Sequence, residues 1–209
     1  MGRPAKFDRE SAVETVMQEI WHGGFERASV KALSERLGIT RSSFYNAFGS
    51  REALFEKVLE RYFDQSPDRP LREAGPQTPI RPLLTSVFRE ICRARAGDDQ
   101  ARGCLVVNGV ADRCRGDMVV DHLASLLAEA LLGSLARIRQ LLDWAQARGE
   151  IAPGADTEAL ALAVQNLLAG LSVVSKVERN EARLWAGTAL TLKGLGLYGE
   201  NGGEGHAQS

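Results

Sequence analysis

The sequence predicts an all-α protein, because apolar residues recur at helical spacing along the 209-residue chain and strand-like alternation is nearly absent. Residue types that cap helices stand directly before several of these periodic stretches. Five of the seven prolines fall within residues 67–82, where a continuous helix is disfavoured because proline lacks a backbone N–H and clashes with the preceding turn. We therefore expect two helical regions joined by a proline-rich connection.

Four helices are expected before the prolines. The first carries an apolar stripe over residues 13–21 and ends at the glycine pair 23–24. The second ends at Gly38, a residue type that readily takes positive φ. The third is short, reaching about residue 47, and the fourth is longer. Three residues can cap the second, third and fourth helices by accepting a hydrogen bond from the first turn: Ser29, Thr40 and Ser50.

Five helices are expected after the prolines, followed by a tail at 199–209 that lacks apolar residues and reads as disordered. The expected domains are therefore 1–65, a connection at 66–79, and a larger helical domain at 80–198. The five helices are expected at about 80–96, 102–112, 117–148, 156–177 and 180–197.

Composition indicates a soluble globular protein, with 44% hydrophobic and 25% charged residues. Polar residues, Glu129 in one and Gln165 and Asn166 in the other, interrupt the longest apolar stretches, so neither offers the roughly 20 apolar residues of a membrane span. The N-terminus has no apolar signal core, so a cytoplasmic location is expected. Three irregularly spaced cysteines indicate reduced thiols.

The total charge does not indicate a nucleic-acid-binding protein. Twenty-six basic and 27 acidic residues give a net charge of -1, and residues 1–62 hold ten basic and nine acidic side chains. Any affinity for DNA must therefore come from one oriented face.

The stretch "TRSSFYNAF" at residues 40–48 has the composition of a DNA recognition helix. Two short helices separated by a few residues with a glycine are the sequence form of a helix-turn-helix, whose second helix enters the major groove. Small hydroxyl side chains let the backbone approach DNA, and Arg41 can bind guanine or phosphate. Phe44 and Phe48, four residues apart, are expected to face inward. The spacing alone fits ordinary helix packing equally well.

Residues 24–55 resemble the N-terminal signature of the TetR family of bacterial transcription regulators. The matching features are Gly24, the turn at 37–40, the Phe44-Tyr45 pair, Phe48, and the stretch 50–54. The resemblance implies a three-helix DNA-binding domain, a fourth connecting helix, and a larger helical domain that dimerises and binds a small ligand.

The same resemblance implies the residues that contact DNA. Tyr45 and Arg51 would bind phosphates, and Ser29 would lie near the backbone. Three positions depart from the family's commoner residues, with arginine for lysine at 51, alanine for histidine at 47 and leucine replaced by Phe44. The full expected set is Ser29, Thr40, Arg41, Ser42, Ser43, Tyr45, Asn46 and Arg51.

The last two helices are rich in Ala, Gly and Leu on more than one face. Small residues allow helices to approach closely, so these two helices form either an intrachain core or, as the family pattern implies, a four-helix homodimer interface. A reader of palindromic half-sites needs two copies, which favours the dimer.

The segment "RGCLVVNGVADRC" at 102–114 holds the most chemically active side chains of the downstream domain. Cys104 and Asn108, four residues apart, share a helical face, and the family resemblance places a ligand pocket beside such a helix. Cys104 is either a thiol sensor of oxidants or electrophiles or a small buried apolar residue. The expected ligand-binding set is Phe88, Cys92, Cys104, Asn108 and His122.

Together these features predict a transcription regulator, most simply a repressor that a small apolar or aromatic molecule releases from a palindromic DNA operator. A thiol-based regulator acting through Cys104 is the alternative. An enzyme or a simple ligand-binding protein is a weaker alternative, because no Gly-rich phosphate loop, metal-ligand spacing or sequence-local nucleophile and base is present. No catalytic residue, metal or cofactor is expected.

Overall fold

The computed structural model describes residues 8–25, 27–112 and 121–199, and within them it is helical, with ten helices and no strand. This confirms the all-α prediction. Cys114 and the predicted tail from residue 200 onward lie outside the described residues. The helices are α1 (Arg9–Gly23), α2 (Val30–Leu37), α3 (Arg41–Phe48), α4 (Arg51–Gln65), α5 (Arg69–Glu73), α6 (Ile80–Ala96), α7 (Leu105–Asp112), α8 (Asp121–Ala147), α9 (Thr157–Val174) and α10 (Glu181–Gly194).

The chain forms two compact units. Unit 1 contains residues 1–66 and 104–129, and so holds α1 to α4, α7 and the first part of α8. Unit 2 contains residues 67–103 and 130–209, and so holds α5, α6, the rest of α8, α9 and α10. The sequence had assigned 104–129 to the downstream domain, but contacts group it with the N-terminal helices.

The first four helices begin and end where side-chain capping predicts. Ser29, Thr40 and Ser50 each accept a hydrogen bond from a backbone N–H three residues later. Gly38 ends α2 at φ 65°, in the left-handed region that glycine enters without a side-chain clash. The core of unit 1 is filled by fully buried side chains, among them Val16, Met17, Phe44, Leu54, Phe55 and Val58.

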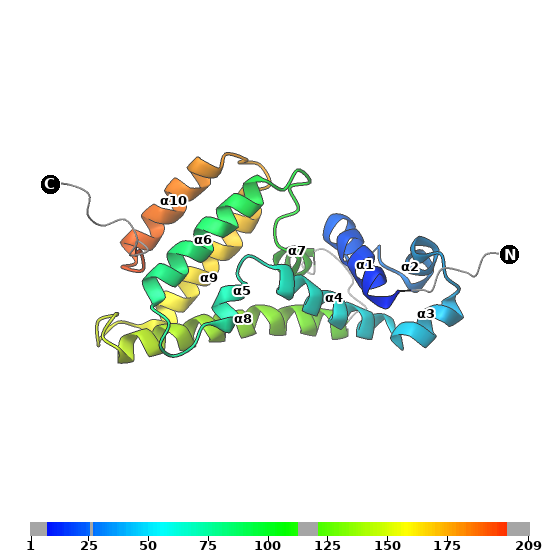
Figure 1. The fold of residues 1–209 in the computed structure, drawn as a ribbon, viewed down its shortest axis with the longest axis horizontal. Coiled ribbons are helices and arrows are strands. Elements are labelled where there is room, and N and C mark those ends of the chain that lie inside the picture. The colour runs from blue at the N-terminus through cyan, green and yellow to red at the C-terminus, as the bar shows by residue number, and fades with distance from the viewer. Residues whose placement is uncertain (1–7, 26, 113–120, 200–209) are drawn as a thin grey trace. The chain divides into compact units, whose positions relative to one another are not determined.

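Unit 2 is built around α6, which packs against both α9 and α10 (Figure 1). Its core is a single cluster of buried apolar side chains from α6, α8, α9 and α10. Gln165, one of the two polar residues that interrupt the apolar stretch of α9, is buried. Its Oε1 accepts a hydrogen bond from Ser134 Oγ at 3.0 Å. This bond satisfies the amide oxygen in an apolar setting.

The α9 helix is long and apolar enough to pass a simple test for a membrane span, with 18 residues and a mean hydropathy of 1.5. A core helix of a soluble protein passes the same test. The side chains of Ala161, Val164, Leu168 and Leu171 belong to the core cluster of unit 2, which accounts for this apolar character.

The proline-rich connection is ordered in part by an arginine of α8. Arg137 donates to the carbonyl oxygens of Leu71, Arg72 and Ala74 at the end of α5. The sequence did not predict α5, a five-residue helix that tolerates Pro70 because the proline lies in its first turn.

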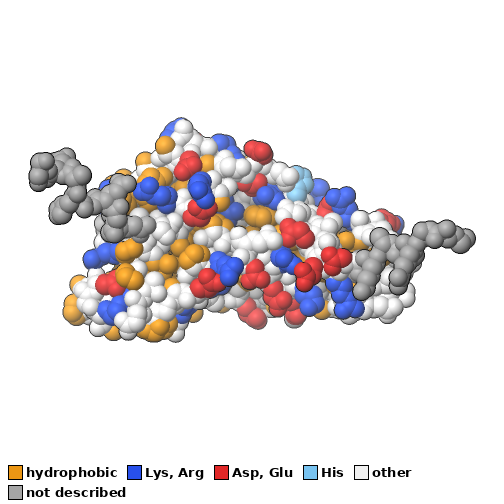
Figure 2. All heavy atoms as spheres, viewed as in Figure 1, with side chains coloured by type: hydrophobic (Ala, Val, Ile, Leu, Met, Phe, Trp, Pro, Cys, Tyr) orange, Lys and Arg blue, Asp and Glu red, His pale blue; other side chains and the backbone are white. Residues whose placement is uncertain are grey.

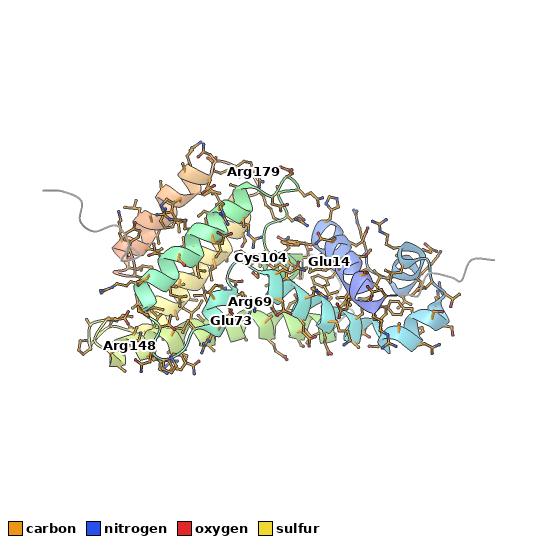
Figure 3. All side chains as sticks on the ribbon, in the orientation of Figure 1. Glu14, Arg69, Glu73, Cys104, Arg148 and Arg179 are labelled. Carbon is orange, nitrogen blue, oxygen red and sulfur yellow. The ribbon has the colours of Figure 1, made fainter. Side chains whose placement is uncertain are left out.

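A second arginine, one residue beyond the end of α8, fixes the residues that follow. Arg148 donates to the carbonyl oxygens of Pro76 and Thr78 and pairs with Glu150 at 2.6 Å (Figure 3). Glu150 in turn accepts a hydrogen bond from Ile80 N at 2.8 Å. That bond caps α6 from outside its own sequence, where the N-cap residue Pro79 offers no side-chain acceptor.

The connection from α6 to α7 is equally constrained. Gly103 has φ 68° and is buried, and a Cβ added to it would lie 2.5 Å from the carbonyl oxygen of Ser172 in α9. Only glycine fits this position, because any side chain would both strain the backbone and collide with another main chain.

Replacing Gly103 with alanine should lower the free energy of unfolding by at least about 2 kcal/mol, since the positive φ and the collision with the Ser172 carbonyl both act against a side chain. Gly133→Ala is the matched control, because Gly133 lies within α8 with no atom within 4 Å of an added Cβ, and it should gain roughly 0.5–1 kcal/mol. Urea denaturation followed by circular dichroism measures both. Equal stability of the two variants would show that the close approach at Gly103 does not exist in solution.

Candidate DNA-binding surface

The turn between α2 and α3 has the hydrogen bonding of a closed helix terminus. Gly38 N donates to Glu35 O at 3.2 Å, and Ile39 N donates to Ser34 O at 3.0 Å. Thr40 then begins α3 as its N-cap, with its Oγ1 accepting from Ser43 N at 3.1 Å. The chain therefore reverses between two eight-residue helices in a short, fully bonded turn.

The α3 helix separates an inner aromatic face from an outer polar face. Phe44 is fully buried and Phe48 is 5% exposed, and their rings contact each other with centroids 5.2 Å apart. The large aromatic side chain of Tyr45 is 51% exposed although its neighbour Phe44 is not. The outer face carries Arg41, Ser42, Ser43, Tyr45 and Asn46, all exposed. These five are the α3 residues that the sequence predicted to face DNA.

Some of the hydroxyl groups predicted to contact DNA also form hydrogen bonds that cap the helices. Thr40 Oγ1 donates its proton to Ser43 Oγ at 3.0 Å while accepting from Ser43 N. Ser43 keeps its own hydroxyl proton for another acceptor. Ser29 likewise caps α2 as an acceptor, from Ala32 N at 3.2 Å, which leaves its O–H able to donate to a phosphate.

Arg51 is a half-buried cation rather than a free one. Its guanidinium carbon lies 5.0 Å from the centre of the Phe55 ring, and its Nε is buried without a hydrogen-bond partner. Stacking on Phe55 restricts the guanidinium to one orientation at the first turn of α4. A phosphate contact from Arg51 would therefore use its outer amino groups.

Charges of both signs are interspersed on the visible face of the molecule (Figure 2). Within unit 1, Arg36 of α2 pairs with Glu19 at 2.6 Å. Lys31 is exposed in the first turn of α2, close in sequence to Ser29. A single lysine on a helix forms no motif, so the sequence does not single it out.

The predicted ligand-binding residues divide between the two units. In unit 1, Cys104 is half-buried just before α7, and its Sγ accepts a hydrogen bond from the Tyr62 hydroxyl at 3.2 Å. Trp21 meets Tyr62 edge to face at 5.1 Å. Asn108 follows one turn later, with its N–H bonded to the Cys104 carbonyl at 2.9 Å. The side chain of His122 lies outside the described part of the structure.

In unit 2, Phe88 and Cys92 are fully buried in the core cluster. Cys92 Sγ lies 3.5 Å from Thr188 Oγ1, and burial raises the pKa of the Cys92 thiol above its usual value despite this hydrogen bond. A protonated, enclosed thiol is a poor nucleophile, so Cys92 acts as a core residue.

Unit 2 has an open hollow of about 510 Å³. Its lining comes from the first turn of α6, the segment before α9, the first half of α9 and the chain after α10. Most of the lining is apolar, with Arg81 and Asp156 as the charged residues, and none of the residues predicted to bind ligand takes part: Arg81, Ile151, Ala152, Ala155, Asp156, Ala159, Leu160, Ala163, Leu195, Gly196 and Leu197.

Two family models match most of the chain. Residues 13–58 match "Bacterial regulatory proteins, tetR family", and residues 82–189 match "Tetracyclin repressor-like, C-terminal domain". The first match spans the helix-turn-helix, and the second spans α6 to most of α10.

Individual relatives agree. The chain is 29% identical over 198 residues, 91% of each protein, to the HTH-type transcriptional repressor ComR of Escherichia coli (strain K12). It is 30% identical over 109 residues to the repressor BdcR of the same organism, covering 52% of this chain and 55% of BdcR. A solved structure of the TetR-family regulator CifR, a cysteine mutant complexed with 26-bp operator DNA, is 31% identical with a TM-score of 0.78, covering 92% of this chain and 98% of that one. The chain therefore belongs to the TetR family and is a DNA-binding transcriptional regulator.

Proposed function

We propose that the protein is a cytoplasmic, homodimeric repressor that binds a palindromic operator through α3 and leaves it when a small molecule binds. The main support for DNA contact comes from the two faces of α3. One face is buried through Phe44 and Phe48, and the other exposes an arginine, two serine hydroxyls, a tyrosine and an amide. Arg41 and Asn46 are suited to base edges, and Tyr45 to phosphate. ComR and BdcR are named as repressors, which supports the sign of regulation.

Operator binding should depend on Arg41 far more than on a comparable arginine elsewhere. Arg41→Ala should weaken binding roughly 10- to 100-fold, because a lost base contact costs about 1–3 kcal/mol. Arg93→Ala removes an equally exposed arginine, one paired with Glu90 on α6, and should leave affinity unchanged. Gel shifts against the DNA flanking the protein's own gene, or against DNA selected from a random pool, measure both variants at two salt concentrations.

Wild-type binding should weaken as salt rises, because each neutralised phosphate releases counterions. If Arg41→Ala and Arg93→Ala bind the selected DNA equally well, α3 does not read the operator, and the assignment of the contact surface must be abandoned.

Exposed apolar side chains of α9 and α10 support the dimer. Leu162, Val173 and Val174 are 50%, 58% and 48% exposed, and Leu190 is 73% exposed. Exposed residues recur at three- and four-residue intervals along both helices, as in a stripe that packs on another helix. The stripe of α9 holds Leu162, Asn166, Gly170, Val173 and Val174, and that of α10 holds Ala186, Gly187, Leu190 and Gly194. Glycine and alanine in the stripes let a second copy approach closely.

Leu190→Glu should convert the dimer to a monomer and reduce operator affinity, because it places charges in the proposed interface and a palindrome is read by two copies. Leu132→Glu is the matched control, since Leu132 is 63% exposed on α8, away from both stripes. Sedimentation velocity gives the mass of each variant. If the Leu190→Glu protein stays dimeric, the dimer interface does not include this stripe of α10.

The hollow of unit 2 supports an apolar effector with an anionic end. Its volume of about 510 Å³ lies within the range of small-molecule sites, and its lining is mostly alanine and leucine. Arg81 supplies a cation at the wall, where its Nε already donates to the Gly196 carbonyl at 2.9 Å. Phe88 and Cys92, the residues predicted for this role, have no exposed surface, so an effector reaching them would have to open the core.

The structure also favours one second route of release, through the Cys104 thiol. Unlike Cys92, Cys104 is only half-buried, and its sulfur is bonded to the Tyr62 hydroxyl of α4. Oxidation or alkylation of the sulfur would replace this hydrogen bond inside the DNA-binding unit.

The two proposed routes of release can be distinguished by which compound releases the protein from its operator in a gel shift. With medium-chain carboxylic acids, we expect reversible release that Arg81→Gln weakens and Cys104→Ser leaves intact, because the acid would pair with the Arg81 guanidinium. The matching arm of the gel shift uses hydrogen peroxide. If only peroxide releases the protein, and Cys104→Ser abolishes that release, the regulator responds to thiol oxidation rather than to a small-molecule effector.

A further inference from the structure

The backbone between α6 and α7 is held in a strained conformation. Ala101 has φ 51°, the one positive φ at a non-glycine residue among those described, and Gly103 has φ 68°. Such residues cost free energy and persist only where surrounding contacts fix them. The segment 97–103 is therefore held in place by its neighbours rather than by its own preference.

Three arginines hold this segment through backbone carbonyls and one carboxylate. Arg179, just beyond α9, donates to the carbonyl oxygens of Ser175 at 2.8 Å and Ala96 at 2.9 Å, and also to that of Asp98 (Figure 3). It thus joins the ends of α9 and α6. Arg95, 7% exposed, donates to the Gly103 carbonyl.

Asp98 and Arg102 close the segment on itself. The Asp98 carboxylate accepts from Arg102 N at 2.8 Å and from the guanidinium at 3.0 and 3.1 Å. Burial works against ionisation of Asp98, but these bonds and the charge of Arg102 outweigh it and hold the pKa of the carboxyl below its usual value. The ion pair is therefore present at neutral pH.

The next residue in the chain, Cys104, belongs to unit 1 and begins the approach to α7. In unit 1, Cys104 and α7 contact residues of the N-terminal part of the chain. Tyr62 of α4 donates to Cys104 Sγ. A Cβ added to Gly109 would lie 2.8 Å from the Phe25 ring and 2.7 Å from Leu127, so α7 already packs against Phe25 without spare room.

Phe25 lies between α1 and α2, at the entrance to the helix-turn-helix, and meets Phe55 of α4 edge to face at 5.5 Å. A displacement of α7 would therefore be transmitted to Phe25 and to Tyr62. Closely packed contacts of this kind shift rather than absorb a displacement, because protein interiors have few voids.

We propose that Arg179 is a positioning residue for operator binding, which acts by fixing residues 96–103, the stretch of unit 2 that continues directly into Cys104. Arg179 itself is not expected to contact DNA. Its effect would pass along the chain through Cys104 and α7, which contact Tyr62 and Phe25 within unit 1. The inference rests on the DNA-binding function and extends it to a residue of unit 2.

The test compares Arg179→Gln and Arg179→Lys with Arg93→Gln, which removes an exposed arginine near the same end of α6. Arg179→Gln should lower operator affinity about tenfold, a typical size for coupling between distant sites. Arg179→Lys should fall in between, since one ammonium group cannot match the planar fork of donors that reaches several carbonyls. Arg93→Gln should match the wild type.

Three further measurements distinguish positioning from general stability. Sedimentation and the unfolding midpoint should show a folded dimer for Arg179→Gln. Amide hydrogen exchange over residues 97–108 should accelerate, and alkylation of Cys104, followed on its own peptide by mass spectrometry, should become faster. Loss of affinity that merely follows loss of folded protein or dimer would overturn the proposal, and so would faster exchange with unchanged operator affinity.

A double-mutant cycle tests the route through α7. Tyr62→Phe removes only the hydroxyl bonded to Cys104. If Arg179 acts through this contact, the combined variant should lose less affinity than the product of the two single losses. Independent effects would show that the route is wrong. Failure of the wild-type protein to bind any operator would instead remove the DNA-binding function itself, an outcome distinct from failure of the Arg179 variants.

Discussion

The recognition helix depends on the burial of two phenylalanines. An eight-residue helix is not stable alone in water, because nucleation is costly and few turns follow to offset it. Phe44 and Phe48 bury one face of α3 against the rest of unit 1, and the Thr40 cap closes its first turn. The opposite face is left to exposed polar side chains, of which Ser43 also accepts a hydrogen bond from the capping Thr40 hydroxyl.

The connections of unit 2 also depend on a few side chains, because their sequence is rich in residues that disfavour helices. Proline and glycine segments have few internal hydrogen bonds, and their carbonyl oxygens need partners when the chain is packed. Arginines in or directly after neighbouring helices supply them: Arg137 and Arg148 for the segment after α4, and Arg179 and Arg95 for the segment before α7. A guanidinium suits this role because its five donors serve several carbonyls at once.

Local sequence patterns predicted the helices well because their signals are local. Ser29, Thr40, Ser50 and Gly38 act within a few residues, and the structure shows each as predicted. The α5 helix was missed because its neighbours are prolines and it is held by Arg137, 65 residues away along the chain from Arg72.

The exposed residues of α3 were predictable for the same reason, since helical phase around Phe44 and Phe48 determines which side chains face outward. The lining of the hollow in unit 2 was not predictable in this way. Phe88 and Cys92 share a helix with the hollow's Arg81 but face the core, and the hollow itself joins segments far apart in sequence. Periodicity shows which residues share a face, but it does not show which faces meet or leave a space.

The near-neutral charge is consistent with a regulator that must also leave its operator. With a net charge of -1, non-specific attraction to the phosphate backbone contributes little, so affinity must come from the geometry of a few contacts on α3. Affinity that depends on geometry is lost when the geometry changes by a small amount. A strongly basic domain would stay on DNA in either conformation, whereas the proposed release requires a ligand to favour a state in which α3 no longer fits the operator. Balanced charge therefore suits the proposed release, because it leaves operator binding dependent on a few oriented contacts.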